Sequence, residues 1–164
     1  MEILVSSNTL SFRGKNYRCA IGQNGFSASK KEGDGCTPIG VFPLRELWYR
    51  ADRLEKPNTK LPARIIAEHD GWCDDPASPD YNKPVTLPYN FSHEKLWRED
   101  NLYDLIIPIG YNDENIVAVA GSAIFMHIAK PNYEGTEGCI ALSLPDFMEI
   151  LPHIDAKTMI SISN

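Results

Sequence analysis

Short apolar stretches alternate with polar, glycine- and proline-containing segments along most of the chain. In residues 16–22, Tyr17, Cys19 and Ile21 occupy every second position, which is the period of a strand with one buried face. The same patterning predicts strands at residues 2–6, 9–12, 16–22, 41–44, 63–68, 103–110, 116–120, 123–129, 139–143 and 158–162. Many short strands separated by turn signals predict a mainly β, β-sandwich-like domain.

A few short helices and two loops complete the expected organisation. Residues 143–151 begin with Ser143 as a helix N-cap, followed by a proline and an aspartate in the first turn. A second short helix is predicted over residues 92–100. The glycine-rich residues 30–40 and the long, polar, proline-rich residues 70–90 read as loops, and a loop as long as the second is more often functional than not.

Size and charge restrict the classes of partner. The 164 residues fit one domain, and roughly 70% of the unfolded surface of such a chain is buried on folding. A net charge of −6 argues against nucleic acid, which needs a basic face. No stretch approaches the ~20 apolar residues of a membrane span, and the N-terminal residues lack the pattern of a secretory signal. We therefore expect a cytoplasmic protein, or a periplasmic one if a leader was removed; its oligomeric state is left open.

The four cysteines, Cys19, Cys36, Cys73 and Cys139, are widely scattered, and none forms a CxxC pair. Free thiols are therefore expected rather than disulfides. The segment 69–75 contains histidine, cysteine and aspartate, but no HExxH motif or second ligand pair accompanies it. The sequence accordingly predicts no metal and no cofactor.

One histidine and one of these cysteines suggest nucleophilic catalysis. In residues 123–129 the apolar positions share one face, so His127 lies on the other face beside Phe125. A hairpin loop between His127 and Cys139 would bring the two together, and an imidazole can take the proton of a thiol to give a thiolate–imidazolium pair. Gly138 permits an unusual backbone conformation, so that its amide and that of Cys139 can face a developing oxyanion. The alternative is a buried cysteine and a packed histidine without a joint role.

Several segments, in the right order, resemble the L,D-transpeptidase (YkuD-like) family. The segment "HIAKPNYEGTEGCIAL" is similar to that family's histidine, loop and Ser/Thr-x-Gly-Cys signature. "TPIGVF" at residues 37–42 matches its Thr-Pro-x-Gly-x-Phe segment. "YDLIIPIGYN" followed by "GSAIFMHI" resembles the run before its catalytic histidine. Together these matches span roughly residues 20 to 150.

The resemblance implies a mainly β catalytic domain that acts on peptidoglycan stem peptides through a cysteine acyl-enzyme. Cys139 would be the nucleophile, His127 the base and then the acid, and the main chain at Gly138 and Cys139 the oxyanion hole. Thr136 would shape the loop. The carbonyl of Ile128 would orient the histidine.

Two positions depart from the family's pattern, namely Glu137 in place of a histidine and Ala141 in place of an arginine or asparagine. Glu137 is expected either to bind His127 or a substrate amine, or to be a solvated loop charge. A substrate carboxylate still needs a cation. The candidates are Arg45, Lys30, Lys31 and Arg98. Trp72 and Tyr81 are expected either to wall a substrate cleft or to anchor their loop on the core.

The favoured activity is that of an L,D-carboxypeptidase, which removes the terminal D-alanine from tetrapeptide stems of soluble muropeptides. This follows from the expected cytoplasmic location, because cross-linking takes place outside the membrane. The first alternative is an L,D-transpeptidase that forms cross-links or exchanges D-amino acids. The second is an inactive module that binds peptidoglycan fragments.

Overall fold

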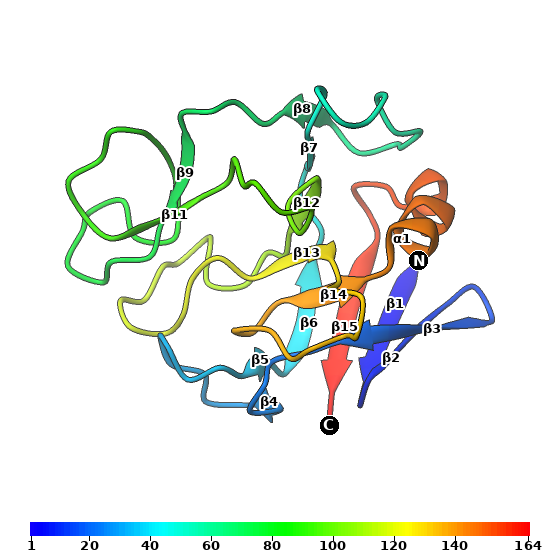
Figure 1. The fold of residues 1–164 in the computed structure, drawn as a ribbon. Coiled ribbons are helices and arrows are strands. Elements are labelled where there is room, and N and C mark those ends of the chain that lie inside the picture. Colours follow the sequence, from blue (N-terminus) through cyan, green and yellow to red (C-terminus); the bar gives the residue numbers. More distant parts are fainter.

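The structure is a computed structural model that describes residues 1–164. Its main feature is a curled 10-stranded sheet, with the strand order β6-β15-β1-β2-β3-β14-β13-β12-β7-β8 (Figure 1). Its strands are β1 (Glu2–Ser6), β2 (Thr9–Phe12), β3 (Lys15–Ala20), β6 (Gly40–Pro43), β7 (Leu47–Tyr49), β8 (Ala63–Ile65), β12 (Leu105–Pro108), β13 (Phe125–Ile128), β14 (Ile140–Leu142) and β15 (Met159–Ser163). The prediction of a mainly β domain is confirmed. Strand β6 lies at the sheet edge, where Pro43 costs no ladder hydrogen bond.

Two small sheets accompany the main one. The first pairs β10 (Pro84–Thr86), β9 (Asp70–Cys73) and β11 (His93–Lys95), and the second pairs β4 (Phe26–Ser27) with β5 (Thr37–Pro38). The three-stranded sheet lies to one side of the main sheet in Figure 1. The stretch at residues 70–90, expected to be a loop, is therefore partly strand.

Helical structure is limited to α1 (Leu144–Ile150) and the 3₁₀ turn η1 (Leu151–His153). The hydroxyl of Ser143 accepts a hydrogen bond from the amide of Asp146 at 3.3 Å, so the predicted N-cap is confirmed. Phe147 and Ile150 of α1 join a core of 25 buried residues to which strands from both ends of the main sheet contribute. None of the helical segments has the length and hydrophobicity required to cross a membrane.

Two predicted elements are wrong. Residues 92–100 are not a helix, because their backbone at β11 pairs antiparallel with β9, and this tertiary pairing overrides local propensity. Residues 116–120 are not a strand. The side chain of Asn112 binds both the N–H and the C=O of Val117, which curls this segment into a turn and leaves Val117 exposed.

The connection between β13 and β14 also differs from the expectation. The two strands are parallel, with His127 opposite Ala141, so the hairpin predicted between His127 and Cys139 does not form. Residues 129–139 carry the chain back to the start of β13 before β14 begins. This places Cys139 next to Phe125, at the beginning of β13, rather than next to the end of that strand.

Candidate active site

His127 and Cys139 lie on the same face of the main sheet. His127 stands opposite Ala141 in the parallel ladder, and Cys139, two residues before Ala141, points the same way. Diagonal neighbours on adjacent strands stand on the order of 7 Å apart, within reach of an imidazole ring. All three residues line one cavity of about 420 Å³. The structure thus brings the histidine and the cysteine to a common site.

The thiol of Cys139 is held at the base of this cavity. Its Sγ donates to the carbonyl of Ala123 at 3.3 Å and accepts from the amide of Phe125 at 3.4 Å. Only 7% of the residue is exposed. A substrate carbonyl must therefore enter the cavity to meet the sulfur.

The imidazole of His127 is oriented by the main chain, as the resemblance implies. Its Nδ1 lies 2.8 Å from the carbonyl oxygen of Ile128, and because a carbonyl only accepts, Nδ1 carries the proton. Nε2 is then the basic nitrogen. The ring of Tyr103 packs edge-on against the imidazole, with 5.4 Å between the ring centroids.

Both reacting groups are neutral in the substrate-free site. Burial raises the pKa of the Cys139 thiol to about 12, and the carboxylate of Glu94 contributes to this shift. Burial lowers the pKa of His127 to about 4, against the opposing hydrogen bond to Ile128. A resting thiolate–imidazolium pair is therefore disfavoured. The proton must leave the sulfur as the thiol attacks, with neutral Nε2 as the general base.

This shift of the His127 pKa makes stability depend on pH. The pKa is about 4 in the folded protein and about 6.5 when unfolded, so the unfolded chain binds more protons between these values and stability falls as the pH drops from 6.5 toward 4. Relative to the non-titrating His127→Gln, the wild type should lose about 2–3 kcal/mol of unfolding free energy between pH 7 and pH 4. Urea denaturation at several pH values measures this difference. If the unfolding free energies of the two proteins changed with pH in parallel, the lowered pKa of His127 would be contradicted.

The loop before Cys139 is fixed by the hydroxyl of Thr37, in the "TPIG" segment. Thr37 Oγ1 donates to the carbonyl of Gly138 at 2.9 Å and accepts from the amide of Gly22 at 2.8 Å. In a trans peptide the C=O and the following N–H point in opposite directions. The amide of Cys139 therefore points away from Thr37, which suits it to receive an oxyanion.

The amide of Gly138 is placed differently from the expectation. It donates to Thr136 Oγ1 at 3.1 Å, and the same hydroxyl donates to the carbonyl of Cys139 at 2.6 Å. Thr136 thus shapes the loop, as the resemblance implies. However, it occupies the donor that was expected to be the second half of an oxyanion hole.

Two of the residues expected to bind substrate lie outside the cavity. Arg45 forms a bidentate pair with Asp113, with distances of 2.8 and 3.0 Å, and lines a separate cavity. Trp72 is buried against Phe125, with 5.0 Å between ring centroids, and its Nε1 donates to Asn82 at 3.0 Å. Trp72 therefore anchors its loop on the core, which was the alternative to walling a cleft.

Three basic residues do line the cavity, namely Lys30, Arg98 and Lys130. Each is already paired with a carboxylate: Lys30 with Asp34, Arg98 with Asp100 and Lys130 with Glu134. The exposed Lys31 does not reach the cavity. Glu137 lines the cavity with an exposed side chain that makes no hydrogen bond or ion pair in the structure, so it does not bind His127.

Glu94 and Tyr103 also line the cavity, and the sequence did not single them out. The phenol of Tyr103 donates to the carboxylate of Glu94. Burial raises the pKa of Glu94 to about 7. Glu94 was not expected at the site, because residues 92–100 were predicted to be a helix. Only the pairing of β11 with β9 turns the side chain of Glu94 toward the site.

Replacement of Glu94 by glutamine should stabilise the protein at alkaline pH. The folded pKa of about 7 lies above the usual value of about 4.3, so the stability that the protonated form provides is complete below pH 4.3 and is lost as the pH rises through 7. The unfolding free energy of Glu94→Gln is expected to exceed that of the wild type by about 3 kcal/mol near pH 8 and to lie within about 0.5 kcal/mol of it near pH 4.5. Urea denaturation measures this, with Glu137→Gln at the exposed mouth as a control that should change little. An equal gain at both pH values would contradict the account.

Over residues 3–162, the chain matches the sequence profile of the YkuD family, described as the L,D-transpeptidase catalytic domain. The chain belongs to this family. YkuD domains are cysteine-dependent enzymes of the L,D-transpeptidase type, and their substrates are peptidoglycan-related. Searches among curated proteins and among solved structures gave no significant match. The structure also contains no group of three or more His, Cys, Asp or Glu side chains able to hold a metal ion.

Proposed function

We propose that this YkuD-family protein is an L,D-carboxypeptidase that removes the terminal D-alanine from peptidoglycan tetrapeptide stems. The observation that carries the proposal is the common cavity of Cys139 and His127. Its volume of about 420 Å³ is in the range of pockets that take a small ligand or the end of a peptide. The choice of water as the acyl acceptor rests on the proposed cytoplasmic location, because cross-linking takes place on the wall.

The chemistry uses two side chains in two half-reactions. Nε2 of His127 takes the Sγ proton of Cys139 while the sulfur attacks the carbonyl carbon before D-alanine, and the carbonyl oxygen becomes an oxyanion at the Cys139 amide. The intermediate collapses, the C–N bond breaks, and the imidazolium gives its proton to the leaving amine. In the second half, His127 takes a proton from water, the hydroxide attacks the thioester, and the released thiolate recovers the proton.

Two further roles belong to this proposal. Glu137, exposed at the cavity mouth, accepts a hydrogen bond from a substrate amine. Thr136 keeps the loop rigid through its bonds to Gly138 and Cys139. We place the protein in the cytoplasm, where soluble muropeptides released from the wall would be its substrates.

The main alternative is the transpeptidase activity for which the family is named. Both reactions share the acyl-enzyme, and they differ in whether water or an amine resolves it. Incubation of the protein with purified disaccharide-tetrapeptide, followed by chromatography and mass spectrometry, separates them. Disaccharide-tripeptide plus free D-alanine supports the carboxypeptidase, whereas a cross-linked dimer supports the transpeptidase. Binding without any product would indicate an inactive module.

A further inference from the structure

Lys30 reaches the active-site cavity through a passage between two glycines. A Cβ at Gly121, where φ is +109°, would lie 2.9 Å from Cε of Lys30, and a Cβ at Gly138 would lie 3.3 Å from its Nζ. Only 3% of the lysine side chain is exposed, yet the residue lines the cavity. The two glycines therefore leave room for an ammonium group beside the loop that precedes Cys139.

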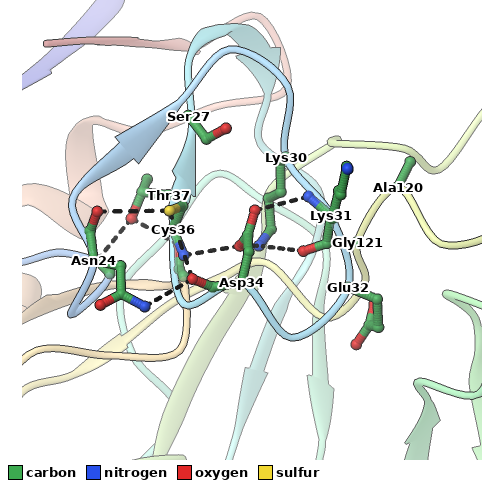
Figure 2. A network of polar contacts seen from close by, with 12 residues as sticks. Asn24, Ser27, Lys30, Lys31, Glu32, Asp34, Cys36, Thr37, Ala120 and Gly121 are labelled. Atoms are coloured by element: carbon green, nitrogen blue, oxygen red, sulfur yellow. Dashed lines mark hydrogen bonds and ion pairs between the residues drawn. The ribbon is translucent and has the colours of Figure 1, made fainter.

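Asp34 holds this ammonium group in place (Figure 2). Its carboxylate accepts from Nζ of Lys30 at 2.8 Å, from the amide of Lys31 at 2.7 Å and from the amide of Cys36 at 2.9 Å. These bonds hold the pKa of Asp34 below its usual value although burial opposes ionisation. The cation is thus fixed by a rigid, ionised partner.

The ammonium of Lys30 keeps donor capacity for a substrate. It has three N–H groups, of which one meets Asp34 and a second makes only a long contact of 3.5 Å to the carbonyl of Lys31. The third has no protein partner. Meanwhile the amide of Gly138, the expected second donor to an oxyanion, is already bound to Thr136.

We propose that Lys30 is a catalytic residue whose ammonium, together with the amide of Cys139, binds the oxyanion formed on the substrate carbonyl. This inference rests on the proposed acyl-enzyme reaction. No covalent change occurs at Lys30: its charge offsets the negative charge that moves from Sγ onto the carbonyl oxygen during attack, and the effect is large because the site is shielded from water.

The other charged side chains that act on Cys139 are negative. Glu94 and Glu137 both disfavour the thiolate, and Lys30 is the positive side chain that favours it. The remaining cavity cations are poorer candidates. Arg98 and Lys130 have side chains that are 35% and 50% exposed, so water screens their charges.

The test compares Lys30→Met with the double variant Lys30→Met/Asp34→Asn. The first removes the cation and keeps the apolar stem, and the second also removes the negative charge of Asp34, which has lost its cation but keeps the amides of Lys31 and Cys36. D-alanine release from disaccharide-tetrapeptide should show kcat reduced by about 100-fold in both variants, the typical effect of losing one oxyanion donor, with KM changed by less than about threefold. Lys130→Met, which removes a cation from the cavity mouth, should retain activity. Recovery of kcat in the double variant would overturn the proposal, because Lys30 would then serve only to neutralise Asp34.

A second readout separates this proposal from the proposed function. In a Cys36→Ser background, which removes the half-buried thiol, alkylation of Cys139 by iodoacetamide reports thiolate formation without any substrate. Lys30→Met and the double variant should both slow this alkylation several-fold between pH 7 and pH 9. A wild type that alkylates as expected but releases no D-alanine would defeat the proposed function alone. Unchanged alkylation in both variants would overturn the role of Lys30.

Discussion

Replacement of Cys139 by serine is expected to reduce D-alanine release by about 10⁴-fold or more while leaving the fold intact, since loss of a nucleophile has effects of this size. A hydroxyl is a much weaker acid than a thiol, and the same imidazole cannot activate it to the same degree. The fold should persist because an Oγ can keep the bonds to Ala123 and Phe125 that Sγ makes now. Turnover assays and thermal melting measure the two effects.

The matched control for this substitution is Cys36→Ser, which changes the same atom in a neighbouring loop. Cys36 is half-buried and lies outside the cavity lining, so its replacement should leave turnover near the wild-type rate. A Cys139→Ser protein that retained a tenth or more of the activity would rule out Cys139 as the nucleophile.

The second large effect is expected at Gly138. Its φ of +137° is a conformation that residues with a Cβ rarely adopt, and a Cβ there would lie 2.7 Å from the carbonyl oxygen of Cys36. Gly138→Ala should therefore lower the unfolding free energy by about 2–4 kcal/mol and reduce turnover by about 10³-fold, because the peptide that carries the Cys139 amide must move. Urea denaturation and the D-alanine assay measure these changes.

Gly33 supplies the comparison for this substitution. Gly33 also lines the cavity and also has a positive φ, of +75°. In contrast to Gly138, a Cβ at Gly33 would meet nothing within 4 Å. Gly33→Ala should cost only about 1 kcal/mol and leave turnover nearly unchanged. Equal effects at Gly33 and Gly138 would mean that backbone strain alone, rather than the placement of the Cys139 amide, explains the loss.

Local patterns were sufficient to predict much of the fold. The two-residue period at Tyr17, Cys19 and Ile21 corresponds to buried positions of β3 and the residues after it, and Ser143 caps α1 as its hydroxyl predicts. These features depend on neighbours within a few residues. The motifs around Thr37 and Cys139 led to the family for the same reason, since each is short and contiguous.

The features that could not be predicted from the sequence depend on contacts between residues far apart in the chain. The parallel register of β13 and β14 depends on where residues 129–139 return the chain, and nothing in that segment specifies it. Glu94 faces the site only because β11 pairs with β9. Arg45 was a reasonable cation to propose, but Asp113, distant in sequence, binds it away from the cavity.

The same long-range contacts explain why the sequence could not identify which basic residue supplies the positive charge of the active site. Lys30, Lys31, Arg45 and Arg98 all carry a positive charge, and only the three-dimensional structure shows which of them reaches Gly138. The feature that singles out Lys30 is the room left by glycines at 121 and 138. A glycine in the sequence does not reveal which side chain will occupy the space beside it.

The most direct test of the account is to locate the covalent intermediate. Protein mixed with disaccharide-tetrapeptide is quenched in acid within the first turnover, digested and analysed by mass spectrometry. We expect a disaccharide-tripeptide acyl group on Cys139 alone, released by hydroxylamine and formed together with an equal amount of D-alanine. Release of D-alanine with no acyl group on Cys139, or with the acyl group on another residue, would contradict it.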